Sequence, residues 1–196
     1  MTDIQTIQTY DKKAEEYKNL ISRDAPDADL TRFINAIPVG GRVLDLGCGP
    51  GNSGAFMVQA GLKVDATDAS IEMVKLAKES FGLNAVQQQF HELSAVDEYD
   101  GIWANFSLLH AKKSEMPELL NKIHTTLKPD GILHLGLMIG TGERREFLGR
   151  FYAYYQPDEV DALLRAAKFT PTHLRTGAST GMSGTEKPFM IVTARA

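Results

Sequence analysis

A glycine-rich stretch between Arg42 and Gly54, RVLDLGCGPGNSG, constrains the fold of this 196-residue chain more than any other feature. An apolar run with one acid, Asp45, leads into a segment with glycine at every second position from Gly47 to Gly51. Glycines let the backbone turn tightly and approach a ligand without interference from a Cβ atom. In open parallel sheets such a turn follows the first strand, where the ligand crevice lies. The stretch therefore predicts a strand, a ligand-binding loop and a helix.

Apolar runs bounded by turn residues recur along the chain and alternate with helical patterns. Such alternation is typical of parallel βαβ units with helices on both faces of the sheet. We expect strands at 42–46, 63–67, 84–88, 99–106 and 131–139, with helices at 51–60, 70–80 and 114–127. The sequence therefore predicts an α/β fold with a Rossmann-like, doubly wound sheet.

The chain ahead of the first strand is helical in pattern. Apolar residues at helical spacing predict helices at 11–20 and 27–37, which would form an N-terminal helical cap on a single domain. We divide that domain into four parts: the cap at 1–40, a ligand-binding core at 41–140, a substrate-side insertion at 141–156, and a C-terminal helix and hairpin at 157–196.

The C-terminal part departs from the alternation. A helix is expected at 157–168, followed by two short strands at 173–176 and 189–194. Adjacent terminal strands most simply pair as an antiparallel hairpin. The glycines and prolines of 177–188 favour a mobile loop between these strands.

Composition and charge exclude several classes of partner. The net charge is -4 with scattered basic residues, so we expect no nucleic-acid partner. The longest nearly apolar segment, 131–140, is far shorter than the roughly 20 residues of a membrane span. The N-terminus lacks the features of a secretory signal, and the single cysteine fits a reducing compartment. We expect a cytoplasmic protein, as a monomer or a homodimer, without a membrane contact.

Two acidic residues near the glycine loop indicate which kind of nucleoside ligand the loop binds. Asp45 lies two residues before Gly47, and Asp68 follows the second predicted strand. A carboxylate at the end of the second strand accepts hydrogen bonds from ribose, which suits any adenosine ligand. Asp45 opposes a pyrophosphate and favours a cation, because no Lys or Arg lies between Val43 and Leu62. We infer a ligand with adenosine at one end and positive charge at the other, namely S-adenosylmethionine.

Three segments carry a resemblance to a known family. The runs V-L-D-L-G-C-G-P-G, V-D-A-T-D-A-S-I-E-M and Y-D-G-I-W-A-N-F-S-L-L-H resemble those of class I S-adenosylmethionine-dependent methyltransferases of the small-molecule type. The resemblance extends from about Tyr10 to Phe169. It implies a seven-stranded, mainly parallel sheet whose last strand is antiparallel and lies next to the sixth.

The resemblance also implies which residues hold the cofactor. The segment from Asp45 to Gly51 would hold its methionine part, and the acid at Asp68 would take the ribose. An apolar side chain, here Met73, commonly covers the adenine, while the adenine amino group often meets an acid after the third strand. This chain has Gln89 and Phe90 at that point. The full set of expected cofactor-binding residues is Tyr10, Asp45, Gly47, Cys48, Gly49, Gly51, Asp68, Ala69, Met73, Gln89, Phe90 and Asn105.

The acceptor is expected near the end of the fourth strand. His110 there would act as a base or orient the acceptor, or else cap or pack on the next helix, and Asn105 and Tyr152 are further catalytic candidates. Tyr10 and Tyr17, one helical heptad apart, resemble the lid of small-molecule methyltransferases, although helix packing explains Tyr17 equally well. Substrate contacts are also expected from the insertion. The alternative interpretation of the insertion is a solvated, charged turn followed by a half-buried strand. The substrate candidates are Tyr17, Arg144, Arg150 and Tyr154.

Other functions remain open at this point. Gly49 to Gly54 also fits the dinucleotide pattern G-x-G-x-x-G, but no tyrosine is followed by lysine four positions on, as a short-chain oxidoreductase requires. A protein that binds the cofactor without catalysis, as a sensor or assembly partner, is the alternative to a methyltransferase. The histidines are too dispersed to indicate a metal site. The acceptor is expected to be a small molecule.

Overall fold

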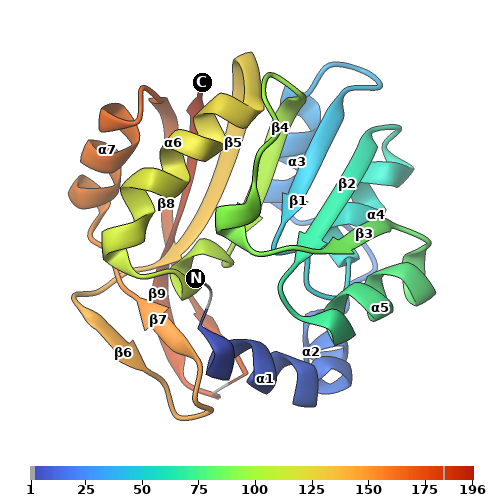
Figure 1. Cartoon of the computed structure of the whole chain (residues 1–196), viewed down its shortest axis with the longest axis vertical. Helices are drawn as coiled ribbons and strands as arrows, with labels where there is room; N and C mark the ends of the chain where they lie inside the picture. The colour runs from blue at the N-terminus through green and yellow to red at the C-terminus, as the bar shows by residue number, and fades with distance from the viewer. Residues whose placement is uncertain (1–2, 183) are drawn as a thin grey trace.

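The computed structural model describes residues 3–182 and 184–196 of the chain. Within them, seven strands form one sheet in the order β3-β2-β1-β4-β5-β9-β8 (Figure 1). The first five strands pair in parallel, whereas β9 is antiparallel to both β5 and β8. The sheet strands are β1 (Arg42–Leu46), β2 (Lys63–Asp68), β3 (Asn84–Gln87), β4 (Tyr99–Asn105), β5 (Leu127–Met138), β8 (Thr170–Thr180) and β9 (Glu186–Arg195). The predicted fold class is confirmed.

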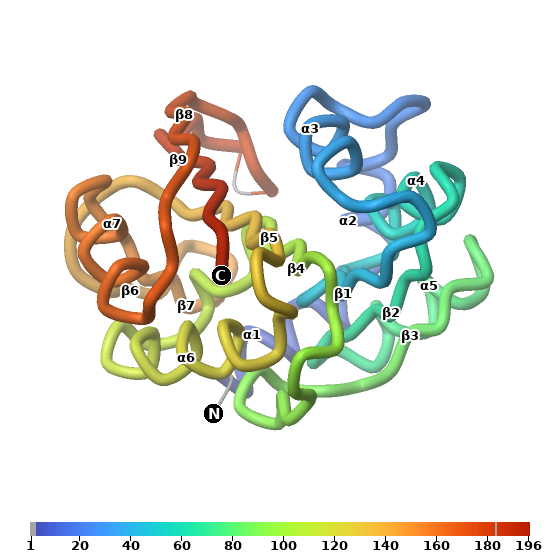
Figure 2. Tube along the Cα trace, turned by 90° about the horizontal axis from the view of Figure 1, so that it is seen from above, coloured from blue at the N-terminus to red at the C-terminus, as the bar shows by residue number. Residues whose placement is uncertain are grey.

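Helices cover both faces of the sheet, as the alternation predicts. The helices are α1 (Ile4–Lys12), α2 (Ala14–Ile21), α3 (Ala28–Ala36), α4 (Asn52–Gln59), α5 (Ile71–Phe81), α6 (Met116–Thr126) and α7 (Pro157–Ala166). Figure 2 shows α3 and α4 on one side of the sheet and α6 on the other. Successive side chains of the central strands point to opposite faces of the sheet. Val43 and Trp103 pack in the core beneath α3 and α4. Leu44 and Ile102 pack in the core beneath α6.

From residue 3 to residue 40, the N-terminal cap contains three helices rather than the two that the sequence predicts. The predicted helix at 11–20 is in fact two helices that meet at Lys13, whose backbone amide donates to the carbonyl oxygens of Thr9 and Tyr10 and so ends α1. Ala14 then packs against α5, with Tyr10 and Tyr17 beside it. The two tyrosines therefore lie on different helices, and their sequence spacing is not a spacing along one helix. Figure 1 shows α1 and α2 across the lower end of the sheet.

The C-terminal hairpin is longer than the sequence pattern predicts. Its pairing runs from Thr170 with Arg195 to Thr180 with Glu186, so most of 177–188 is strand, and the expectation of a loop there is wrong over those residues. Ser183, at the turn, lies outside the described residues. Ladder pairing with β9 overrides the local preference of small polar residues for loops. The expectation of an antiparallel hairpin is confirmed.

The insertion forms a small hairpin of its own. Strands β6 (Glu143–Arg145) and β7 (Phe151–Ala153) pair in antiparallel fashion outside the main sheet. This hairpin lies at the same end of the molecule as α1 (Figure 1). The hydroxyl oxygen of Thr6 accepts a hydrogen bond from the Phe151 amide (2.8 Å), and Arg145 pairs with Asp3. The cap and the insertion are thus joined across the carboxyl ends of the strands.

Candidate functional site

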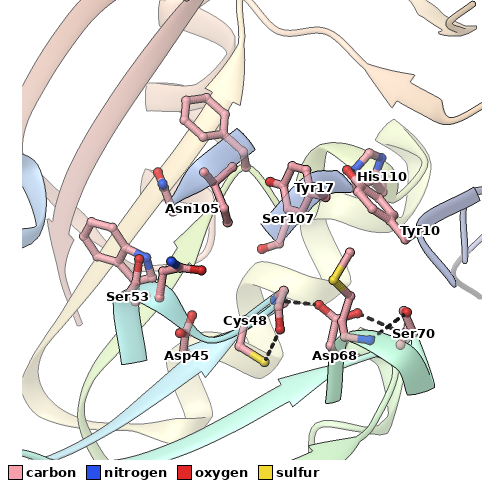
Figure 3. Close-up of a pocket in the computed structure, with 18 of the residues that line it drawn as sticks. Tyr10, Tyr17, Asp45, Cys48, Ser53, Asp68, Ser70, Asn105, Ser107 and His110 are labelled. Atoms are coloured by element: carbon pink, nitrogen blue, oxygen red, sulfur yellow. Dashed lines mark hydrogen bonds between the residues drawn. The ribbon is translucent and has the colours of Figure 1, made fainter. Parts of the chain in front are cut away.

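A cavity of about 380 Å³ lies at the carboxyl ends of β1, β2 and β4, beneath α1 and α2 (Figure 3). Its floor is the glycine loop after β1, and its roof includes Tyr10 and Tyr17. This is the place where an open parallel sheet binds its ligand. The predicted cofactor residues that line the cavity are Tyr10, Asp45, Gly47, Cys48, Gly49, Asp68, Ala69, Met73, Phe90 and Asn105.

Gly47 shows why the loop requires glycine. Its φ angle is +77°, and a Cβ atom there would lie 2.3 Å from Cβ of Ser107. The Ser107 hydroxyl donates to the carbonyl oxygen of Leu46 (2.6 Å), which holds the loop after β4 against the loop after β1. Any larger side chain at Gly47 would push these two loops apart and distort the floor of the cavity.

Asp45 places an unsatisfied carboxylate in this floor. Its side chain is 2% exposed, and its Oδ2 atom has no hydrogen-bond partner of normal geometry within residues 3–182 and 184–196. Burial, reinforced by the charge of Asp68, raises the pKa of Asp45 to about 7, although the nearby Gly54 amide opposes this shift. A buried polar atom without a partner is costly and indicates a missing ligand group. The group that fits a carboxylate here is a hydrogen-bond donor, preferably a cation.

Asp68 is held rigidly at the end of β2. Its Oδ2 accepts from the Gly49 amide (2.9 Å), and its Oδ1 accepts from the Ser70 amide (2.8 Å). Burial raises its pKa to about 6 despite these bonds. The Ser70 hydroxyl also donates to Asp11 (2.5 Å), which ties α1 to the start of α5. Each carboxylate oxygen keeps a free lone pair, so Asp68 can accept two further hydrogen bonds, as a ribose diol offers.

Arg23 is a site residue that the sequence analysis missed. The segment between Val43 and Leu62 contains no Lys or Arg. The connection between α2 and α3, however, brings the Arg23 side chain to the cavity wall. There it pairs with Asp27 and donates to the Ser53 hydroxyl (3.2 Å). Asp27 also caps α3, a local role that hides its place at the cavity. No spacing in the sequence connects Arg23 with the glycine loop, so only the fold reveals it.

Cys48 in the lining, and Gly51 and Gln89 outside it, complete the predicted cofactor residues. Cys48 is buried, and burial together with the neighbouring acids raises the pKa of its thiol, so the thiol stays protonated. Gly51 is the N-cap of α4 with a φ of +92°, and Gln89 is the N-cap of a 3₁₀ turn at Phe90–Glu92. Neither Gly51 nor Gln89 belongs to the lining of the cavity, so their contacts with the cofactor stay predictions.

The end of β4 presents a polar side chain with a fixed orientation. Asn105 Oδ1 lies 3.1 Å from Nε2 of His134, which is buried and stacked on Trp103. Burial lowers the pKa of His134 to about 3, so a neutral His134 donates its Nε2–H to Asn105 Oδ1. The Asn105 amide nitrogen is thereby left for the cavity. The next residue, Phe106, has a φ of +56°, a strained conformation typical of functional sites.

A chain of hydrogen bonds connects the cap, the insertion and η2 (Leu108–His110). His110 Nδ1 lies 2.7 Å from the Phe151 carbonyl oxygen and must donate to it, so Nε2 accepts from the Tyr10 hydroxyl (2.9 Å). Arg150 donates to the same hydroxyl (3.1 Å) and pairs with Glu146 (3.0 Å). Burial lowers the pKa of His110 to about 4. Because both ring nitrogens of His110 form hydrogen bonds, its side chain orients the Tyr10 hydroxyl in this structure. A role of His110 as a general base stays a prediction.

The predicted substrate residues divide between two places. Tyr17 and Arg150 line a second cavity, of about 240 Å³, next to the first, together with the catalytic candidate Tyr152. Arg144 and Tyr154 lie elsewhere: the Arg144 guanidinium stacks on the Tyr154 ring at 3.9 Å, and neither residue belongs to the lining of the two cavities. Their roles as substrate contacts stay predictions.

In the part of the chain that the structure describes, no three His, Cys, Asp or Glu side chains are placed to hold a metal ion. The same part contains no helix whose length and apolarity would suit a membrane span.

Comparisons with known proteins agree with this geometry. Residues 43–131 match the model of a family described as a methyltransferase domain. The cypemycin N-terminal methyltransferase of a Streptomyces species is 34% identical over 134 residues, which are 64% of this chain and 55% of that protein. An uncharacterized methyltransferase of Staphylococcus carnosus is 28% identical over 156 residues, which are 70% of this chain and 75% of that protein. The chain spans about half the length of most of the curated relatives it matches.

The fold has counterparts among solved structures. The 1,6-didemethyltoxoflavin-N1-methyltransferase of Burkholderia thailandensis, with bound 1,6-didemethyltoxoflavin and S-adenosylhomocysteine, superposes with a TM-score of 0.74. The superposition covers 97% of this chain and 87% of that chain, at 23% identity. At this level of identity the likeness concerns the fold.

Proposed function

We propose that the chain is a class I S-adenosylmethionine-dependent methyltransferase and that it transfers a methyl group from S-adenosylmethionine to a small-molecule acceptor, a proposal that the match to a methyltransferase domain, the methyltransferase relatives and the fold support. The observation that carries the proposal is the buried Asp45 carboxylate beside Asp68 in the floor of the larger cavity, whose Oδ2 atom has no hydrogen-bond partner among the described residues. A site for a pyrophosphate would carry donors at this point instead. The small molecule bound to the Burkholderia neighbour supports an acceptor of that size.

The residues of the cavity fit the cofactor from end to end. Asp68 has lone pairs for the ribose hydroxyls, and Asp45 supplies the negative charge that an α-ammonium group requires. Met73 and Phe90 offer apolar surface for an adenine. The aromatic faces of Tyr10 and Tyr17 are suitable partners for a sulfonium.

The residues around the acceptor have binding and shielding roles. When bound, S-adenosylmethionine supplies an electrophilic methyl group on a good leaving group, so the protein need only align the acceptor and exclude water. Asn105 presents its amide nitrogen at the end of β4, as a donor to an acceptor oxygen or nitrogen. Tyr10, held by His110 and Arg150, closes the cavity from the cap.

The proposal is tested with labelled cofactor. The protein is incubated with methyl-labelled S-adenosylmethionine and a metabolite pool, and binding of S-adenosylhomocysteine and NADH is measured by calorimetry. We expect label to leave the cofactor and only S-adenosylhomocysteine to bind. Tight binding without label transfer would instead favour a sensor or assembly protein, and binding of NADH alone would contradict the family's cofactor.

Binding of S-adenosylhomocysteine is expected to weaken on acidification. Burial raises the pKa of Asp45 to about 7 and of Asp68 to about 6, so both are ionised at pH 8 and largely protonated at pH 5.5. The cationic ammonium binds ionised Asp45 and the ribose hydroxyls donate to ionised Asp68, and each unit of pKa corresponds to a factor of ten. We expect affinity to fall about 10- to 100-fold between pH 8 and pH 5.5 in calorimetric titrations. A flat profile would mean that these acids do not bind the ligand's ammonium and ribose groups.

A further inference from the structure

The second cavity adjoins the first and shares part of its wall. Tyr10, Tyr17, Ile21 and Phe106 line both spaces, so a ligand in one can reach a ligand in the other. The outer wall of the second cavity is the turn end of the β8–β9 hairpin, where the pairing reaches Thr180 and Glu186. It is thus assembled from the cap, the insertion and the C-terminal hairpin, whereas the first cavity rests on the glycine loop.

The two cavities carry opposite charge. Three carboxylates, those of Asp27, Asp45 and Asp68, line the first cavity together with one cation, Arg23, which pairs with Asp27, so its lining keeps a net negative charge. Among the described residues that line the second, none is acidic, and Arg150 and Lys187 are both present. A cleft with one negative and one positive half favours two ligands of opposite charge.

The cations of the second cavity retain capacity for a ligand. Nε of Arg150 donates to the Glu146 carboxylate, and Nη1 donates to the Tyr10 hydroxyl. Nη2 has no hydrogen-bond partner among the residues that the structure describes. Lys187 lies with its ammonium 5.6 Å from the centre of the Tyr152 ring, and it forms no ion pair within 3–182 and 184–196. Glu146 offsets one of the two charges, so this side of the cleft keeps about one positive charge.

The remaining lining is flat and apolar. Tyr152, Phe106, Leu109 and Met138 provide ring faces and aliphatic surface. Tyr152 lies under the cationic groups, with the Arg150 guanidinium 5.3 Å from its ring centre. Such a pocket suits a planar body of a size that 240 Å³ accommodates, with its charged group directed to Arg150 and Lys187.

We propose that the second cavity binds the methyl acceptor and selects a planar aromatic acid, with one carboxylate or comparable anionic group held between Arg150 and Lys187. The inference rests on the proposed methyltransferase function, since it assigns the acceptor's class. Carboxylates pair with guanidinium and ammonium groups through charge-assisted hydrogen bonds, which are stronger than those of neutral groups.

The test uses benzoate and its neutral analogue benzamide as probes, added to protein saturated with S-adenosylhomocysteine and followed by ligand-observed NMR. We expect benzoate to bind about tenfold more tightly than benzamide and to weaken as salt is raised. Lys187→Gln should lower benzoate affinity about 3- to 10-fold and leave benzamide affinity unchanged. Lys63→Gln, a change at an exposed lysine at the start of β2, is the matched control and should leave both affinities unchanged.

Two results would overturn the inference. One is equal binding of benzoate and benzamide, and the other is benzoate affinity that Lys187→Gln does not alter. Binding of S-adenosylhomocysteine is measured separately in each variant. If that ligand does not bind, the proposed function fails; if it binds while benzoate shows no preference, only the acceptor class fails.

Discussion

Replacing Asp45 with asparagine is expected to weaken S-adenosylhomocysteine binding about 10- to 150-fold and, at the same time, to stabilise the unliganded protein. The loss of affinity follows from a charge-assisted hydrogen bond, which contributes about 1.5–3 kcal/mol. The gain in stability follows from burial, which raises the pKa of Asp45 from 3.8 to about 7. Because the raised pKa belongs to the folded state, the ionised carboxylate destabilises the fold by on the order of 4 kcal/mol above pH 7.

The stability effect has a defined pH dependence. The cost is absent below about pH 4, where Asp45 is protonated in both states, and it grows as pH rises towards 7. We expect Asp45→Asn to raise the free energy of unfolding by about 1–3 kcal/mol at pH 8, since the amide is itself incompletely bonded, and by little at pH 4. Denaturant titrations at both pH values measure this difference.

Asp65→Asn is the matched control for the Asp45 variant. Asp65 lies on β2 in register with Leu44, outside the lining of the larger cavity, and accepts hydrogen bonds from Arg42 (2.7 Å) and Asn84 (2.9 Å). This change should leave S-adenosylhomocysteine affinity unaltered and lower stability by at most about 1 kcal/mol. Unchanged affinity in Asp45→Asn, or a loss of stability there, would contradict a ligand-facing role for its carboxylate.

Replacing Arg150 with methionine is expected to cost about 3 kcal/mol of unfolding free energy. The Arg150 and Glu146 side chains are 4% and 3% exposed; Arg150 donates to Oε1 of Glu146, and Oε2 has no hydrogen-bond partner among the described residues. Although burial opposes it, the Arg150 guanidinium holds the pKa of Glu146 below its usual value. Without the guanidinium, a buried carboxylate is left unpaired. The loss should be larger at pH 8 than at pH 5, where Glu146 can take up a proton.

Two further variants separate the ion pair from general packing. The double change Arg150→Met with Glu146→Gln should recover most of the lost stability, because no buried charge remains. Arg165→Met removes another arginine paired with an acid four residues before it, Asp161, but these side chains are 60% and 47% exposed. We expect that change to cost less than about 0.5 kcal/mol. Equal losses for Arg150→Met and Arg165→Met would show that burial does not strengthen the Glu146 pair.

Several sequence-based expectations about the whole protein stay predictions. They concern the cytoplasmic location, a monomeric or homodimeric state, the absence of a nucleic-acid partner and the division into four parts. The catalytic roles of His110, Asn105 and Tyr152 also stay predictions. What the structure adds for His110 is the pair of hydrogen bonds that engage its ring.

The sequence by itself determined the sheet and its ligand-binding loop. Strands and helices alternate with local periodicities of two and 3.6 residues, and the glycines of the segment from Gly47 to Gly51 are required by backbone conformation. Both signals are contained in neighbouring residues. Asp45 and Asp68 could be placed at the same crevice, because parallel strands bring their carboxyl ends to one edge of the sheet.

Only the tertiary structure decided what surrounds that crevice. Arg23 reaches the glycine loop, Arg150 reaches Tyr10 across 140 positions, and Lys187 reaches the second cavity from the C-terminal hairpin. Local preference even favoured a loop where β8 and β9 pair. Contacts of this kind arise from packing between distant segments, which leaves no periodic trace along the chain. The carboxylates of Asp45 and Asp68 in the larger cavity were therefore evident in the sequence, whereas Arg23 there and the cations of the second cavity depended on the fold.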